Sequence, residues 1–235
     1  PRLQAAMARR FGLDSACVVP GCGSNGIIDL LIRVKAVPGV HNIVAFKPCF
    51  SEYQLQARLC GVEFRQMPLR EDFSFPWDDF LGLMDENTAI AFVTTPDNPT
   101  GFCPPAAELE ALARALPPYC LLVIDEAYMD FCADAAAHSL LPRLNDFPNV
   151  AVLRTFSKSY GLAGLRLGCG LMHPELAGVL RNVSIPFAVS LAAEEAGLAA
   201  LEDTAFYQET LRVTREGRTW LSAELKKLGC EVWPS

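Results

Sequence analysis

The stretch VAVLRTFSKSYGLAGLRLG at 150–168 sets the organisation of this chain. Its first seven residues form an apolar, β-branched run that is typical of a buried strand. The run breaks at Lys158, which lies between two serines, and a turn of small residues with Arg166 leads into a second strand-like run. A lysine at a strand end is either a surface residue that buries only its stem or a residue that does chemistry, and this window alone does not decide between them.

Short apolar runs alternate with amphipathic stretches along most of the sequence. Strand–helix alternation predicts a mainly parallel sheet, and continuously apolar strands indicate burial on both sheet faces. We therefore predict an α/β fold of three layers, with the sheet between two layers of helices. The predicted strands are 16–20, 42–46, 62–69, 90–95, 121–128, 150–156 and 165–172, and the predicted helices are 27–37, 53–61, 105–116 and 174–183.

The sequence from residue 188 onward has a helical pattern. A long second helix is expected to end at Gly229, because glycine commonly follows the last turn of a helix. The segment CEVW at 230–233 would then begin a further strand. The chain starts at Pro1 without a methionine and stops directly after this segment, so we expect a piece of a longer protein.

Charge and hydropathy argue against several classes of function. The net charge is −7 and no run of basic residues exists, so nucleic-acid binding through a basic face is not expected. No apolar run reaches the roughly 18–20 residues of a membrane span, and no signal peptide is visible. The chain's three histidines lie far apart in sequence, so we expect no metal site.

The nine cysteines are scattered, and none of them forms a CxxC pair. This spacing argues against a zinc ribbon and against a disulfide scaffold. We expect free thiols in a reducing compartment such as the cytoplasm.

Residues capable of chemistry follow several of the predicted strands. The turn GCGSNG at 21–26 leads into a helix and would expose backbone N–H groups to an anion, although such turns are common. Asn98 lies in an irregular loop, and Asp125 ends an almost wholly apolar run with Tyr128 three residues later. Because ligands of open parallel sheets bind beyond the carboxyl ends of the strands, we expect these groups and Lys158 at one edge.

Such a set of residues suits chemistry on a carbonyl group. A lysine held in a mostly apolar cleft can lose its proton and form a Schiff base. Burial of an ionised aspartate costs free energy unless a cation lies next to it. Such an aspartate would keep a pyridine nitrogen protonated, and a protonated pyridine ring accepts electrons. Phe50 and Tyr53 follow another strand, and taken alone they are best explained as core residues.

Five motifs together resemble the class I/II aminotransferases, which are pyridoxal-phosphate enzymes of fold type I. They are GCGSNGIIDLL, PCFSEY, TTPDNPTGF, VIDEAYMDF and TFSKSYGLAGLRLG, and they occur in the order that this family has. Within the family the chain is most similar to the histidinol-phosphate aminotransferases. The resemblance covers nearly the whole chain and implies pyridoxal 5′-phosphate (PLP) as cofactor.

The resemblance implies a role for each matching residue. Lys158 would hold the cofactor covalently and then move the substrate Cα proton, while Asp125 would pair with the cofactor's ring nitrogen. Tyr128 and Asn98 would bind the phenolate oxygen, and Phe50 would stack on the ring where the family often has tyrosine. The cofactor phosphate would be held by Arg166, Ser24, Asn25, Thr155 and Ser157. Gly164 would allow close backbone packing beside the site.

The resemblance also has consequences for the whole protein. It implies an amino acid or amino-phosphate substrate, a 2-oxo acid partner and a homodimer in the cytoplasm. Residues 1–202 would be the cofactor-binding large domain, and 203–235 the connecting helix and start of a small domain that is largely missing. The family's substrate-carboxylate arginine would lie beyond Ser235, and its tyrosine that crosses the dimer would lie before Pro1. The anion turn reads GSNG where the family commonly has an acidic residue.

Two other functions remain open from the sequence. A threonine-phosphate decarboxylase of cobalamin synthesis has the same fold and could use the same lysine, and PCFSEY with PLRED at 68–72 favours it. A non-catalytic module with a nucleotide in the glycine-rich turn is a third possibility. That turn lacks the GK[ST] of a P-loop, and the module gives no role to Lys158, Asp125 and Asn98.

Overall fold

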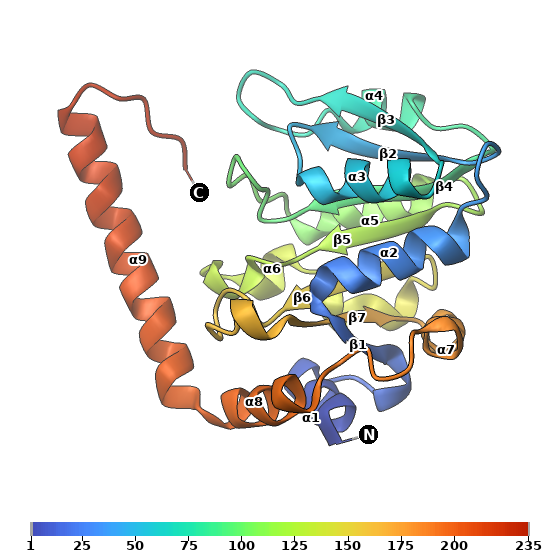
Figure 1. Ribbon diagram of the computed structural model, residues 1–235. Coiled ribbons are helices and arrows are strands. Elements are labelled where there is room, and N and C mark those ends of the chain that lie inside the picture. Colours follow the sequence, from blue (N-terminus) through green and yellow to red (C-terminus); the bar gives the residue numbers. More distant parts are fainter. Residues whose placement is uncertain (1, 235) are drawn as a thin grey trace.

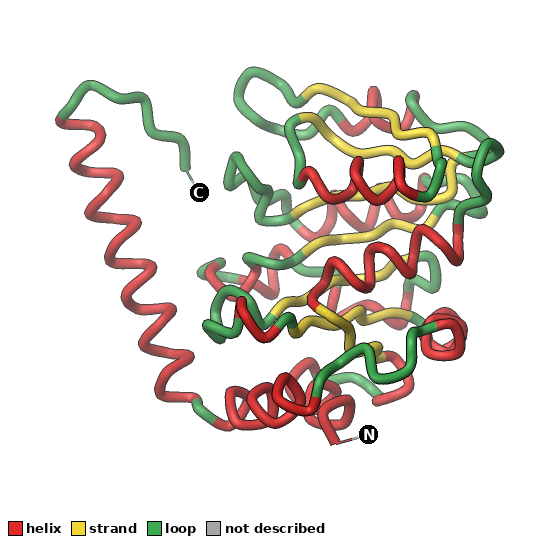
Figure 2. The backbone as a smooth tube through the Cα atoms, viewed as in Figure 1, coloured by secondary structure: helices red, strands yellow, loops and turns green. Residues whose placement is uncertain are grey.

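A single seven-stranded sheet organises the chain, whose computed structural model describes residues 2–234 (Figures 1 and 2). The strand order is β1-β7-β6-β5-β4-β2-β3, and neighbouring strands are parallel except that β7 is antiparallel to both β1 and β6. The mainly parallel sheet predicted from the sequence is therefore confirmed. The strands are β1 (Val18–Cys22), β2 (Asn42–Lys47), β3 (Glu63–Pro68), β4 (Thr88–Thr94), β5 (Leu121–Asp125), β6 (Val150–Thr155) and β7 (Leu167–Met172).

Helices cover both faces of the sheet and give it two hydrophobic cores. Successive strand residues point to opposite faces, so Val44 and Phe46 enter one core while Ile43 and Ala45 enter the other. The first core is closed by α1 (Arg2–Phe11), α4 (Trp77–Gly82), α5 (Ala106–Ala115) and α8 (Leu191–Glu202). The second is closed by α2 (Gly23–Lys35), α3 (Ser51–Leu59) and α7 (Pro174–Val183). The predicted three-layer α/β fold is confirmed.

Three local predictions need correction. The helix expected from residue 27 begins at Gly23, so the glycine-rich turn forms the first turn of α2. The strand expected over 121–128 ends at Asp125, because the chain turns there and continues into the short helix η2 (Met129–Phe131). Residues 230–234 form no strand in the described part of the chain. Trp233 packs edge-on against Phe73, with ring centroids 5.1 Å apart, and the segment contributes no strand to the seven-stranded sheet of the described residues.

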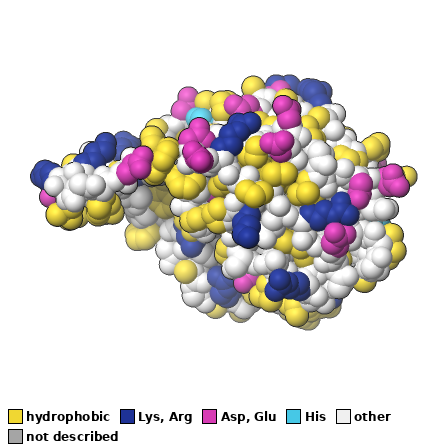
Figure 3. All heavy atoms as spheres, turned by 90° about the horizontal axis from the view of Figure 1, so that it is seen from above, with side chains coloured by type: hydrophobic (Ala, Val, Ile, Leu, Met, Phe, Trp, Pro, Cys, Tyr) yellow, Lys and Arg dark blue, Asp and Glu magenta, His cyan; other side chains and the backbone are white. Residues whose placement is uncertain are grey.

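The last helix projects from the body of the molecule (Figures 1 and 3). Helix α8 ends at Glu202, and Asp203 then caps α9 (Thr204–Lys227) by accepting a hydrogen bond from the Phe206 amide at 2.9 Å. None of the residues of α9 is fully buried, and its exposed hydrophobic side chains include Val213 and Trp220.

No helix in the described range 2–234 is both long enough and apolar enough to cross a membrane.

Candidate active site

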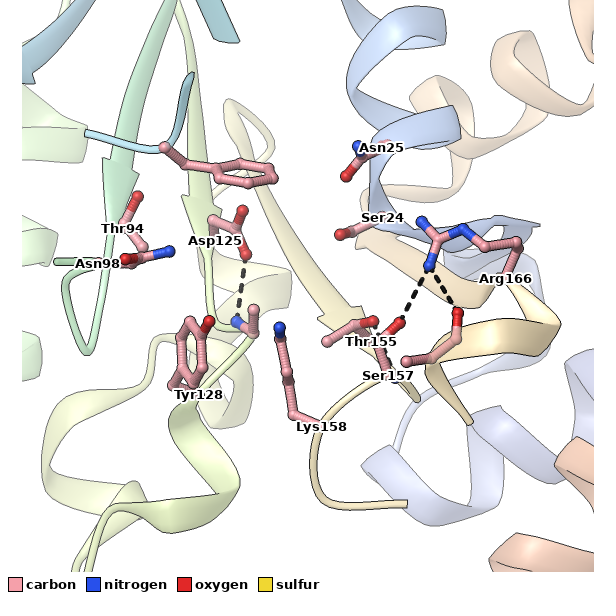
Figure 4. A pocket seen from close by; sticks show the side chains of 13 residues that line it. Ser24, Asn25, Thr94, Asn98, Asp125, Tyr128, Thr155, Ser157, Lys158 and Arg166 are labelled. Atoms are coloured by element: carbon pink, nitrogen blue, oxygen red, sulfur yellow. Dashed lines mark hydrogen bonds between the residues drawn. The ribbon is translucent and has the colours of Figure 1, made fainter. Parts of the chain in front are cut away.

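A cavity of about 200 Å³ opens at the carboxyl ends of the parallel strands (Figure 4). Thr94, Ala127 and Ala163 line it, together with all ten residues that the sequence analysis had selected. The fold therefore brings these residues together at one edge of the sheet, as expected. The ten are Ser24, Asn25, Phe50, Asn98, Asp125, Tyr128, Thr155, Ser157, Lys158 and Arg166.

Asp125 forms the floor of this cavity at the end of β5. Its carboxylate is 3% exposed and accepts two hydrogen bonds, from the Tyr53 hydroxyl at 2.8 Å and from the Ala127 amide at 3.1 Å. Burial raises the pKa of Asp125, and this effect exceeds the opposing effects of the two hydrogen bonds and of the Lys158 charge. A cation placed against the carboxylate would offset the free-energy cost of burying its negative charge, so the position is suited to a cationic group of a ligand.

Tyr53 is a site residue that the sequence analysis assigned to the core. It is buried, its ring stacks on Phe92 with centroids 4.3 Å apart, and its hydroxyl bonds both Asp125 and Thr94 Oγ1 at 2.8 Å. Burial, followed by the negative charge of Asp125, raises the pKa of Tyr53, which keeps the phenol protonated as a donor. The sequence offered only a general signal, because a buried tyrosine hydroxyl usually has a polar partner but the sequence does not identify that partner.

Lys158 lines the cavity but is not enclosed by it. Its side chain is exposed, and ten of the thirteen residues that line the cavity are polar or charged. The Nζ atom lies 5.2 Å from the centre of the Tyr128 ring, and Figure 4 shows it on the side of the cavity facing Asp125. Lys158 follows the end of β6 at Thr155, and it is exposed although Phe156 and Tyr160 beside it are buried in the first core.

The opposite side of the cavity has donors arranged for an anion. Arg166 donates to the Ala163 carbonyl at 3.0 Å and to Ser157 Oγ at 3.4 Å, and the Gly23 amide donates to the Arg166 carbonyl at 3.0 Å. Gly23 has a φ of +67°, a left-handed conformation that favours glycine, and a Cβ there would lie 2.7 Å from the Arg166 guanidinium. With Ser24 in the first turn of α2, the arrangement suits a phosphate group.

The expectation for Gly164 is wrong. A Cβ at Gly164 would meet nothing within 4 Å, because the turn that contains it is open to solvent. The close backbone approach occurs instead at Gly168 on β7, where a Cβ would lie 2.5 Å from the Ser24 amide nitrogen. This glycine lets the start of α2 lie directly against β7.

A buried ion-pair network supports the segment that follows Asp125. Arg154 on β6 lies 2.8 Å from Glu126 Oε2 and 3.0 Å from Asp130 Oδ1. Glu126 is 1% exposed and Arg154 is 9% exposed, and burial raises the pKa of Glu126 against the opposing charge of Arg154. The network fixes the chain between Asp125 and Tyr128 against β6, and the sequence analysis did not detect it.

We expect Arg154→Met to lower the free energy of unfolding by about 3–5 kcal/mol, because it leaves the buried carboxylate of Glu126 without its cation. Chemical denaturation measures this loss. The control is Arg143→Met, which removes an exposed arginine paired with Glu110 and Asp146 and should cost less than about 1 kcal/mol. Equal losses in the two variants would contradict the assignment of a stabilising role to the buried network.

Comparison with known proteins gives one consistent result. The profile described as "Aminotransferase class I and II" matches residues 1–235. The chain is 65% identical over 235 residues to a histidinol-phosphate aminotransferase of Oleidesulfovibrio alaskensis, and 67% identical over 235 residues to one of Nitratidesulfovibrio vulgaris. All of this chain aligns in both cases, but it spans 61% and 63% of the lengths of these relatives.

A solved structure has the same fold. The crystal structure of histidinol-phosphate aminotransferase from Sinorhizobium meliloti in complex with pyridoxal-5′-phosphate superposes with a TM-score of 0.93 at 29% sequence identity. The match covers 100% of this chain and 63% of that one. The sheet, the cavity at its carboxyl edge and the full-length family match agree with one another. The chain therefore belongs to the class I and II aminotransferase family.

Proposed function

We propose that this chain is the cofactor-binding part of a PLP-dependent aminotransferase acting on histidinol phosphate or a similar amino-phosphate. One observation carries the proposal: Lys158, the buried Asp125 and the Arg166–Ser24 anion site line the same cavity. The cavity's donors match the groups of PLP, with a costly carboxylate for a cationic ring nitrogen and an arginine with a helix start for a phosphate. The names and high identity of the relatives support the substrate.

Each side of the cavity would bind one part of the cofactor. Arg166, Ser24, Asn25, Thr155 and Ser157 would hold the phosphate, and Phe50 would cover the ring. Asp125 would hold a proton at the ring nitrogen, and Tyr53 would hold Asp125 in place. Tyr128 and Asn98 would donate hydrogen bonds to the phenolate oxygen.

Lys158 would act twice. Its Nζ would hold the cofactor covalently, and the same amine, once free of the cofactor, would move the proton at the substrate Cα. PLP supplies, when bound, a protonated ring that withdraws the electron pair left at Cα. The exposure of Lys158 places its Nζ where an arriving substrate can reach it.

Several features of the whole protein belong to the same proposal. A 2-oxo acid would accept the amino group, and two copies would assemble as a homodimer, as the family resemblance implies. Residues 203–235 would connect the large domain to a small domain, which agrees with the break at Asp203 between α8 and α9. All nine cysteines are free, which supports a reducing compartment such as the cytoplasm.

The function can be tested by absorption spectroscopy of the full-length protein loaded with PLP. Addition of histidinol phosphate should replace the visible absorbance of lysine-bound PLP by the near-ultraviolet absorbance of the aminated cofactor. The alternative, decarboxylation of threonine phosphate, would release carbon dioxide from that substrate and leave the visible band unaffected by histidinol phosphate. Absence of any visible band with PLP would overturn the proposal as a whole.

We expect Tyr53→Phe to reduce kcat by about tenfold, because a hydrogen bond to a charged group contributes about 1.5 kcal/mol. That hydrogen bond lowers the pKa of Asp125, so its loss raises this pKa. Activity that needs the ionised carboxylate is present above the pKa and is lost as the pH falls through it, so the acid limb of the kcat profile should move to higher pH.

The control for this variant is Tyr119→Phe, which changes a tyrosine that is 72% exposed and lies outside the cavity. It should leave both kcat and the pH profile unchanged. An unshifted acid limb in Tyr53→Phe would show that Tyr53 does not tune Asp125 in the working enzyme.

A further inference from the structure

Cys103, Cys132 and His138 come together outside the cofactor cavity. One ligand atom of each residue lies within 4.8 Å of the other two, and all three side chains are partly buried. They come from three separate segments, namely the loop after β4, the end of η2 and the last residue of α6 (Ala135–His138). Sequence spacing gave no sign of this cluster, because it contains one histidine and no CxxC pair.

A backbone carbonyl group lies against one ring nitrogen of the cluster's histidine. His138 Nδ1 lies 2.9 Å from the Pro104 carbonyl oxygen, which can only accept a hydrogen bond. Nδ1 therefore carries the proton, and Nε2 keeps the lone pair that could bind a cation. Metal-binding histidines commonly have this arrangement, in which a backbone carbonyl fixes the tautomer and the ring orientation.

The two thiols have no role in the proposed transamination. Neither sulfur lines the cofactor cavity, and Cys103 Sγ lies 3.4 Å from Thr95 Oγ1. Both cysteines line a second cavity of about 590 Å³ beside Thr214 and Arg218 of α9, so an ion and a fourth ligand have access to the cluster.

We propose that Cys103, Cys132 and His138 form a binding site for a zinc ion. Two thiolates and one imidazole are a donor set that zinc accepts in tetrahedral geometry, and three protein ligands leave one position for water or another ligand. Binding would replace the two thiol protons by the ion and release them to solvent. The atoms must approach one another somewhat, because zinc–sulfur bonds are about 2.3 Å long.

A zinc ion at this position would connect two segments of the cofactor cavity. Asn98 lies in the loop that leads to Cys103, and this loop is closed by the hydrogen bond from the Asp97 amide to the Phe102 carbonyl at 2.8 Å. Tyr128 begins the turn that leads to Cys132, with the Phe131 amide donating to its carbonyl at 3.0 Å. The ion would hold the loop with Asn98 against the turn with Tyr128, so the site would stabilise the wall of the cavity.

The first test is zinc binding to the reduced full-length protein under argon. We expect one zinc ion per chain in competition with a chromophoric chelator, and the double variant Cys103→Ser/Cys132→Ser should bind at least about 100-fold more weakly. The matched control is Cys60→Ser/Cys230→Ser, which changes two cysteines outside the cluster and should leave the affinity unchanged. Unchanged affinity in the first double variant, or no zinc binding by the native protein, overturns the proposal.

A second measurement keeps the test independent of the variants' folding and of the proposed catalysis. X-ray absorption at the zinc edge of the native protein should show two sulfur ligands at about 2.3 Å and a nitrogen at about 2.0–2.1 Å. The Lys158→Ala variant should bind zinc as the native protein does, because that residue lies outside the cluster. A ligand shell of oxygen and nitrogen alone overturns the assignment, whatever the outcome for transamination.

Discussion

Replacement of Lys158 by alanine is expected to abolish covalent attachment of PLP and to reduce transamination at least about 10⁴-fold. Alanine removes both the amine that attaches the cofactor and the group that moves the Cα proton, and proton transfer alone contributes about 10²–10⁴-fold. Borohydride reduction of the PLP-loaded full-length protein, followed by peptide mapping, should place the label on the native Lys158 peptide and on none in the variant.

Two further variants sharpen this prediction. Lys158→Arg keeps the positive charge but should be as inactive as Lys158→Ala, because a guanidinium does not lose its proton in a protein. Lys47→Ala is the matched control, since Lys47 also lies at the carboxyl end of a strand but outside the cavity. It should retain activity and labelling, and a label found on Lys47 in the native protein would refute the assignment of Lys158.

Replacement of Asp125 by asparagine is expected to leave PLP bound but to reduce kcat by about 10²–10³-fold. The amide keeps the shape of the carboxylate but cannot balance a positive charge at the ring nitrogen, and loss of one such electrostatic group has effects of this size. Binding should persist because Lys158 and Arg166 lie on other sides of the cavity (Figure 4). Steady-state kinetics and the PLP content of the purified variant measure the two effects separately.

Asp97→Asn is the matched control for this variant. Asp97 is another carboxylate near a strand end whose pKa is raised by burial, but it lies outside the cofactor cavity. It accepts hydrogen bonds from the Thr100 hydroxyl at 2.7 Å and the Thr100 amide at 3.3 Å, so its change should affect the stability of the loop more than the chemistry. A near-native kcat for Asp125→Asn would contradict the proposed role of Asp125.

The fold was largely predictable because its strands are continuously apolar and its helices lie between them. The direction of β7 was not predictable from its composition, since parallel and antiparallel pairing would bury the same side chains. The length of the loop 156–166 determines the antiparallel direction, because this loop is shorter than the dozen or more residues that a crossover between parallel strands usually requires. Residues 230–233 have the composition of a strand, but a strand needs a neighbour to pair with, and composition does not supply one.

The candidate site could be predicted where its residues follow the carboxyl ends of parallel strands. Ligands bind beyond the carboxyl ends of parallel strands, and this rule selected Asp125, Asn98 and Lys158 without knowledge of any contact. Tyr53 was missed because its hydroxyl reaches Asp125 from α3, and the sequence separation of 72 residues hides such a contact. The exposure of Lys158 was missed because the composition around a residue does not determine its accessibility.

The position of β1 at the edge of the sheet has a consequence for the order in which the protein is completed during synthesis. β1 pairs with β7, and Val18 lies opposite Leu171. Residues 18–35, which form β1 and α2, therefore leave the ribosome before β7, the strand that pairs with β1, has been made. The hydrogen bond from the Gly23 amide to the Arg166 carbonyl can form only after Arg166 has been made, so the anion site cannot close before that point.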